Sequence, residues 1–190
     1  VPFDITADEV AARKPAAIIM SGGPASVYAP DAPHMDPAIL DMGIPVLGFC
    51  YGIQEMAIAL GGDVPRTDVG EYGFAELTVA PCASKLLEGV PPVSQVWMSH
   101  RDSVGAVPAG FTVTGSTATT AVAVMECDDR RLYATQFHPE VAHTEYGQKM
   151  LENFLYEVAG IPPMWTMFNI IEETIDRIRG QVGTDRVILG

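Results

Sequence analysis

The feature that most constrains the fold of this chain is a short apolar strand that runs directly into a helical pattern. Residues 45–49 form an apolar stretch of strand length, and residues 51–60 place apolar side chains at helical spacing. Cys50 lies on the turn between them, with Gly48 and Gly52 two residues away on either side. A strand followed at once by a helix is the repeating unit of α/β folds.

The patterns on both sides of this unit extend the same architecture. Residues 6–9 form a capping box that opens a short helix, and residues 16–20 are a second, fully apolar strand. Further along, the pattern predicts a helix over 145–158 and strands near 73–80, 93–99, 111–116, 121–127 and 131–137. We therefore predict an α/β fold, in which a doubly wound, mostly parallel sheet with a flavodoxin-like core carries an antiparallel meander at its edge.

The last part of the chain reads as the start of a second domain. Residues 161–163, Ile-Pro-Pro, are typical of a linker, and apolar residues at helical spacing then predict an amphipathic helix that ends at Gly180. Residues 187–190 read as a buried strand that is cut short. We interpret residues 1–160 as one domain and residues 161–190 as a linker followed by the opening of another.

Composition excludes several classes of function. Of 190 residues, 24 are acidic and 11 are basic, and the net charge of −13 opposes binding to nucleic acid, since such partners need a basic face. No apolar run reaches the roughly 20 residues of a membrane span. The three cysteines form no C-x-x-C pair, so we expect neither a disulfide framework nor a cysteine zinc site. A reducing, cytoplasmic location fits this cysteine usage.

Cys50 is the candidate nucleophile. The sequence Gly48-Phe49-Cys50-Tyr51-Gly52 has the spacing of a nucleophile elbow, in which a side chain at either glycine would collide with neighbouring backbone. The helix that follows places N–H groups and the positive end of its dipole beside the sulfur, which favours the reactive thiolate. The alternative is a buried cysteine that acts only as a small hydrophobic side chain.

A cysteine nucleophile needs a base, and two histidines compete for that role. His100 and His138 both lie at strand ends, and each has an acidic residue two positions later, Asp102 and Glu140. Either acid could hold its histidine in one tautomer, so either pair would complete a Cys-His-acid triad, and the residues alone leave the choice open. A metal site at His138, Glu140 and His143 is disfavoured, because zinc helices space their histidines by four positions and these are five apart.

The stretch Ser21-Gly22-Gly23-Pro24 follows the strand at residues 16–20. Its successive N–H groups could cradle a phosphate, but the stretch lacks the Lys and the Ser/Thr of a phosphate-binding loop. A second source of oxyanion N–H groups beside the elbow fits better.

Residues 48–54 and 136–140 together resemble the class I (triad) glutamine amidotransferases. Residues 21–24, 96–100 and 138–144 extend the resemblance over nearly the whole chain. It implies that Cys50 attacks the carboxamide of glutamine and that His138, oriented by Glu140, is the base. The resemblance further implies an oxyanion hole from the backbone N–H groups of Gly23 and Tyr51, substrate binding by Gln54, Ser99, His100 and Asp102, and no metal.

The resemblance also has implications beyond this site. It implies no cofactor in residues 1–190, and ATP and magnesium in a full-length enzyme. The implied partners are glutamine, an ATP pyrophosphatase domain of the same full-length chain, and a second copy of that chain in a homodimer, with neither nucleic acid nor membrane involved. Two other functions stay open: a stand-alone γ-glutamyl hydrolase with the same triad, and a non-catalytic module that keeps the fold.

Two departures from the family pattern carry expectations of their own. Arg101 replaces a glycine, and an arginine there would be strained if the position needs a positive φ. The family's opening strand and helix, with a D-F-G-x-Q-Y segment, have no counterpart, and the chain begins at Val1. Because that strand is central in the family's sheet, we expect residues 1–190 expressed alone to be unstable or to aggregate. A sharp two-state thermal transition from a monomeric sample would contradict this expectation.

Overall fold

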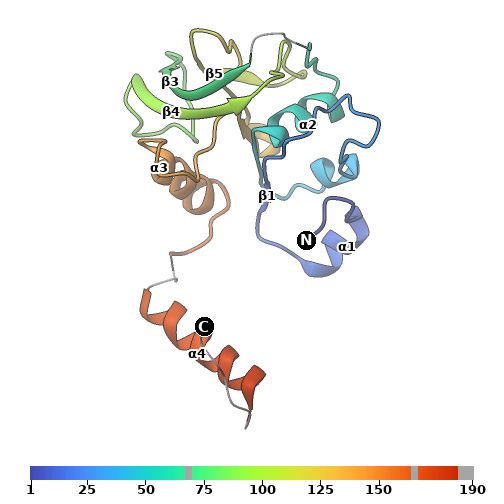
Figure 1. Ribbon diagram of the computed structural model, residues 1–190, viewed down its shortest axis with the longest axis vertical. Coiled ribbons are helices and arrows are strands. Elements are labelled where there is room, and N and C mark those ends of the chain that lie inside the picture. The colour runs from blue at the N-terminus through green and yellow to red at the C-terminus, as the bar shows by residue number, and fades with distance from the viewer. Residues whose placement is uncertain (67–69, 164–166, 184–190) are drawn as a thin grey trace.

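The computed structural model describes residues 1–66, 70–163 and 167–183 (Figure 1). The described strands are β1 (Ile18–Met20), β2 (Val46–Phe49), β3 (Glu71–Val79), β4 (Val93–His100), β5 (Thr112–Ser116), β6 (Val124–Cys127) and β7 (Leu132–Thr135). The described helices are α1 (Ala7–Arg13), α2 (Tyr51–Ala59), α3 (Gly147–Glu152) and α4 (Met167–Val182), with 3₁₀ turns at Pro37–Asp41 and Asp128–Arg130 and a π-helical stretch at Asn153–Val158.

The described strands form one mixed sheet in the order β1-β2-β7-β6-β5-β3-β4. The pairs β1–β2 and β2–β7 are parallel, whereas the pairs from β7 through β6, β5 and β3 to β4 are antiparallel. The predicted α/β class, with a parallel part and an added meander, is confirmed. The meander is a larger share of the sheet than we expected, because β7 turns back from it to lie beside β2.

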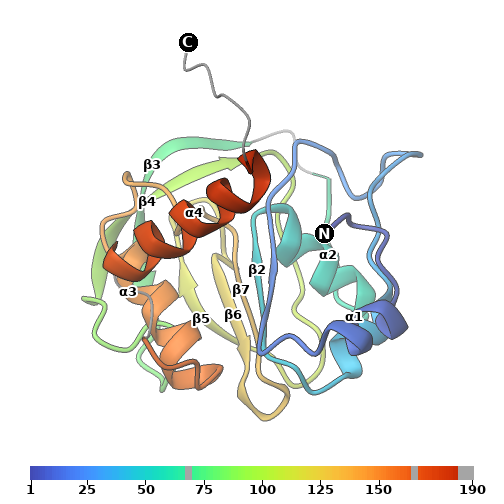
Figure 2. The same cartoon turned by 90° about the horizontal axis from the view of Figure 1, so that it is seen from below.

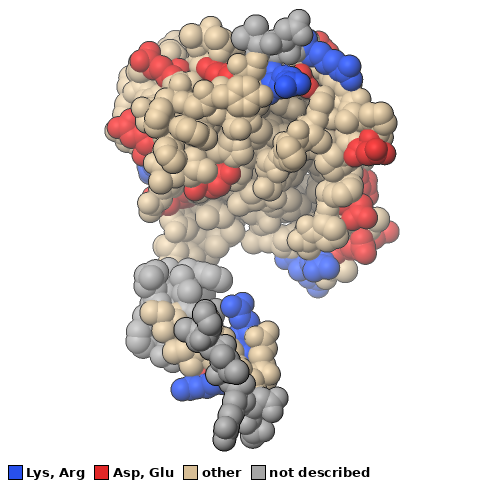
Figure 3. Space-filling model, in the orientation of Figure 1, with Lys and Arg blue, Asp and Glu red and all other residues tan. Residues whose placement is uncertain are grey.

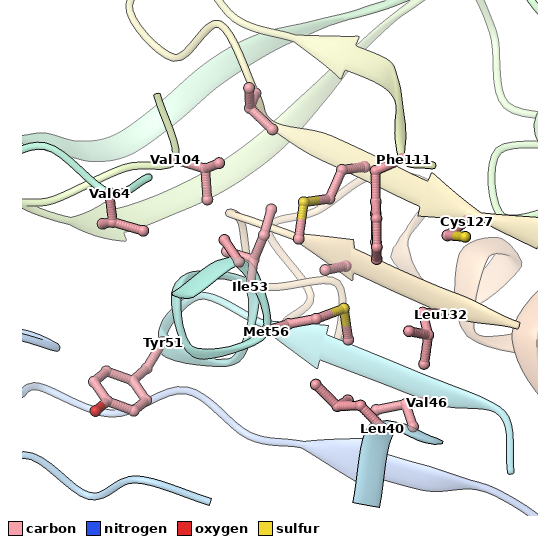
Figure 4. Close-up of a cluster of buried hydrophobic side chains, with 14 of the residues drawn as sticks. Leu40, Val46, Tyr51, Ile53, Met56, Val64, Val104, Phe111, Cys127 and Leu132 are labelled. Atoms are coloured by element: carbon pink, nitrogen blue, oxygen red, sulfur yellow. The ribbon is translucent and has the colours of Figure 1, made fainter. Parts of the chain in front are cut away.

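Helices cover both faces of the sheet, as in a doubly wound fold (Figure 2). On one face, Val46 and Leu132 of the sheet share a buried cluster with Met56 of α2 (Figure 4). On the other face, Leu47 shares a second cluster with Phe154 of the π-helical stretch. Val46 and Leu47 are adjacent in β2 and point to opposite faces, because side chains alternate along a strand. The strand that carries Cys50 is therefore buried on both sides.

One edge of the sheet is open within the described structure. There β1 pairs only with β2, and Ile19 in its centre is 48% exposed. An apolar cavity of about 530 Å³ runs beside this strand and is lined by Val10, Ile18 and Met35, among others. An unpaired edge presents free backbone groups to other chains. The expected instability of the isolated chain stays a prediction, and this open edge supports it.

The predicted helix after the linker is α4, which runs from Met167 to Val182. The helix stop predicted at Gly180 is wrong, because a glycine inside a helix costs only about 1 kcal/mol relative to alanine and does not break it. The helix instead ends next to Gly183, whose φ is +56°. The strand predicted over 187–190 lies outside the described residues.

The described surface and helices bear on two further expectations. In the view of Figure 3, acidic side chains are spread over the surface and basic ones form small separate groups. Within the described residues, no helix combines the length and apolar character that crossing a membrane requires.

Candidate active site

Cys50 lies on a strained turn between β2 and α2. Its φ of +51° and ψ of −100° fall outside the regions that non-glycine residues favour. A Cβ at Gly48 would lie 2.8 Å from the carbonyl group of Gly52, and a Cβ at Gly52 would lie 2.6 Å from the carbonyl oxygen of Met20. Only glycine fits at these two positions, which confirms the steric argument for a nucleophile elbow.

The thiol of Cys50 faces a cavity of about 400 Å³. Its Sγ lies 3.4 Å from the carbonyl oxygen of Ser99, to which the thiol donates. The structure brings the residues predicted for the oxyanion hole and for substrate binding to the walls of this one cavity. They are Gly23, Tyr51, Gln54, Ser99, His100 and Asp102.

His138 lies beside the thiol, and Glu140 lies behind His138. The hydrogen bond with Cys50 is the main cause that raises the pKa of His138 to about 9; partial burial opposes this shift, and Glu140 adds to it. Nδ1 of His138 lies 2.8 Å from Oε1 of Glu140, so the carboxylate fixes the tautomer that leaves Nε2 for the sulfur. This geometry favours His138 over His100 as the base.

Neighbouring segments hold the His138 loop in place. The N–H of His138 donates to the carbonyl oxygen of Trp97 over 3.1 Å, and the hydroxyl of Thr144 donates to the carbonyl oxygen of His138 over 2.5 Å. A Cβ at Gly22 would lie 3.0 Å from Cε1 of His138 and 3.3 Å from Cβ of Cys50. Gly22 therefore leaves the space in which base and nucleophile meet, a role that its Ser-Gly-Gly-Pro setting did not reveal.

A metal site has no support in the described residues, where no group of three His, Cys, Asp or Glu side chains could hold an ion. His143 lies away from such a role, because its ring packs against Trp97 with centroids 4.6 Å apart.

The two predicted oxyanion donors lie side by side near Cys50. Tyr51 is the first residue of α2, and the first N–H groups of a helix have no partner within it. A Cβ at Gly23 would lie 3.8 Å from Cγ of Tyr51, which places the two residues in contact. The assignment of both N–H groups to an oxyanion hole stays a prediction.

Gln54 and Asp102 join two walls of the cavity. Nε2 of Gln54 donates to the carbonyl oxygen of Asp102 over 2.6 Å, and the hydroxyl of Ser26 donates to Oδ2 of Asp102 over 2.7 Å. Arg101, between His100 and Asp102, also lines the cavity. Its φ is not positive, so the strain considered for an arginine at this position does not arise.

Comparison with known proteins identifies the class to which this fold and site belong. The family model of class-I glutamine amidotransferases matches residues 1–158, and the chain belongs to that family. Curated relatives described as GMP synthase (glutamine-hydrolyzing) include those of Thermobifida fusca and Streptomyces coelicolor, which are 54% and 50% identical over 190 residues. These alignments cover all of this chain but 36% of each relative, so the chain spans about a third of their length.

Solved structures agree with the family. A GMP synthase component from Thermoplasma acidophilum superimposes with a TM-score of 0.72 at 30% identity, over 91% of this chain and 83% of that one. A glutamine amidotransferase from Methylobacillus flagellatus gives a TM-score of 0.59 at 24% identity, over 76% and 58% of the two chains, and supports the fold alone.

Proposed function

We propose that this chain is the glutamine-hydrolysing part of a GMP synthase. The observation that carries the proposal is the contact of His138, backed by Glu140, with Cys50 on a strained elbow, in a chain about half identical to proteins of that name. The released ammonia serves the ATP-dependent amination of XMP to GMP in the remainder of the protein. Cys50, His138 and Glu140 are the proposed catalytic residues.

The proposed reaction has two steps. The thiolate of Cys50 attacks the carboxamide carbon of glutamine, and the negative charge that develops on the carbonyl oxygen is stabilised by the N–H groups of Gly23 and Tyr51. His138 takes the thiol proton and passes it to the leaving nitrogen, so that ammonia departs and a glutamyl thioester remains. Water, deprotonated by His138, then attacks the thioester carbon and releases glutamate and the free thiol.

Glutamine fits the cavity that Gln54, Ser99, His100 and Asp102 line, and we assign these residues to its amino and carboxylate ends. We assign ATP and magnesium to the proposed ATP pyrophosphatase domain of the full-length protein. We further propose a homodimer of that protein and a cytoplasmic location. The location is supported by three cysteines that are all free.

The substrate test uses the full-length protein. Glutamate release is measured with free glutamine and with a γ-glutamyl peptide, before and after the thiol is blocked with iodoacetamide. We expect release from free glutamine, little from the peptide, and none after alkylation. A preference for the peptide would indicate a γ-glutamyl hydrolase, and no release from either substrate would indicate a non-catalytic module; both results would overturn the proposal.

Glu140→Gln should lower turnover and shift its pH dependence. The carboxylate of Glu140 raises the pKa of His138, so its loss lowers that pKa below the value of about 9. The thiolate–imidazolium pair is lost as pH rises through the pKa of His138, and the alkaline limb of the kcat/KM profile should therefore move to lower pH. Because the side chain of Glu140 is 42% exposed, we expect a loss in kcat of only about 10-fold, the low side of general acid–base effects.

The control for this variant is Glu157→Gln, which removes an exposed carboxylate of the π-helical stretch. Glutamate release is followed over pH for the wild type and both variants. An unchanged rate and profile in Glu140→Gln would remove Glu140 from the mechanism.

A further inference from the structure

A second carboxylate, Glu71, lies behind the cavity on the side away from Cys50. Glu71 is the first residue of β3 and pairs with His100, the last residue of β4. Its side chain is 16% exposed and accepts hydrogen bonds from two hydroxyls: Thr120 at 2.7 Å and Thr117 at 3.0 and 3.1 Å. The mechanism above makes no use of this partly buried acid.

His100 connects Glu71 to the wall of the cavity. The His100 side chain is 3% exposed, and its Nε2 lies 3.6 Å from Oε2 of Glu71 and 3.4 Å from the hydroxyl of Thr120. Its Nδ1 lies 3.1 Å from the carbonyl oxygen of Asp102. That oxygen only accepts, so Nδ1 carries a proton and donates it.

The charge state of His100 agrees with this arrangement. Burial lowers the pKa of His100 more than Asp102 and Glu71 raise it, so the ring is neutral near pH 7 with its proton on Nδ1. Nε2 is then an acceptor, and the hydroxyl of Thr120 lies between it and the carboxylate of Glu71. The orientation of the ring thus depends on the hydroxyls that Glu71 holds.

The loop of residues 100–102 is clamped at the carbonyl of Asp102. That oxygen accepts from Nδ1 of His100 on one side and from Nε2 of Gln54 on the other. The start of β3 also touches the loop, because a Cβ at Gly70 would lie 2.7 Å from the carbonyl oxygen of His100. This loop follows Ser99, whose carbonyl accepts from the thiol of Cys50.

We propose that Glu71 is a positioning residue for the glutamine site, which it orders through Thr120, His100 and the carbonyl of Asp102. Glu71 does not line the cavity and takes no part in bond making or breaking. It keeps the loop in the one arrangement that binds the substrate. The inference rests on the proposed function, because the substrate of the cavity is glutamine in both.

The test is Glu71→Gln in the full-length protein, with glutamate release measured over a range of glutamine concentrations. The amide that replaces one oxygen donates where the carboxylate accepts, so Thr120 and His100 lose their present order. If the binding-competent arrangement becomes a minor state, KM rises in proportion to its lost population, and we expect an increase of about 5-fold or more. The kcat and the rate at which iodoacetamide alkylates Cys50 should stay at the wild-type values.

Two further variants complete the test. Thr120→Val removes the bridging hydroxyl at nearly constant volume and should raise KM in the same way, so the inference stays testable if Glu71→Gln folds poorly. Glu76→Gln, an exposed acid on the same strand, is the control and should leave KM unchanged.

The outcomes separate this inference from the proposed function. A wild-type KM in both Glu71→Gln and Thr120→Val, or a fall in kcat without a change in KM, would overturn the role of Glu71 and leave the proposed function standing. A wild-type protein that releases no glutamate would overturn both.

Discussion

Replacing Cys50 with alanine should abolish glutamate release from glutamine while the protein stays folded. The thiol is the proposed nucleophile, and its loss leaves His138 and Glu140 with no group to activate. Losses on removing a nucleophile are large, and we expect the rate to fall at least about 1,000-fold. Alanine is small and relieves crowding at the turn, so the melting temperature should change little, although the positive φ of +51° still strains a non-glycine residue.

The chain offers a matched control for this variant. Cys82 is free and exposed, and Cys82→Ala should keep wild-type activity. In the wild type, an alkylating glutamine mimic should label Cys50 and spare Cys82, which mass spectrometry of digested protein can establish. Full activity in Cys50→Ala, or labelling confined to Cys82, would contradict the proposed mechanism.

Gly147→Ala should impair catalysis although Gly147 does not contact the cavity. A Cβ at this first residue of α3 would overlap the carbonyl oxygen of Pro139 and lie 2.8 Å from its carbonyl carbon. Pro139 stands between His138 and Glu140, so the loop that carries base and acid must move. A displacement of about 1 Å in an active site can cost about 100-fold in rate, and we expect a loss of that order in kcat/KM.

Overpacking at Gly147 should also lower the free energy of unfolding, by about 1 to 3 kcal/mol, which chemical denaturation of the full-length protein measures. Gly180 provides the control, because it lies in α4, where an added Cβ would meet nothing within 4 Å. Gly180→Ala should keep full activity and favour the helix slightly, since alanine is the better helix former. Wild-type kcat/KM in Gly147→Ala would show that the loop tolerates the shift.

The local parts of the site could be predicted from the sequence. The elbow around Cys50 is encoded by neighbours two residues away, because the steric need for Gly48 and Gly52 arises within one strand-turn-helix unit. The capping box at Thr6 and Glu9 is local in the same sense, and it forms as predicted. The α/β class also follows from short-range patterns of apolar residues.

The choice of base could not be predicted from the residues alone. His100 and His138 have the same local signature, a histidine at a strand end with an acid two positions on. They differ in what tertiary packing places beside them: His138 meets Cys50, whereas His100 is turned toward Glu71 and Asp102. The resemblance to a family pointed to His138, and the geometry supports that choice.

The sequence by itself determined which segment presents a nucleophile, because backbone sterics and a helix start act over a few residues. The tertiary structure alone decided which histidine reaches the sulfur, how Gly22 and Gly147 make room for it, and that Glu71 lies behind the cavity. These relations join residues tens of positions apart, and only the pairing of strands and the packing of the two cores bring such residues within contact distance.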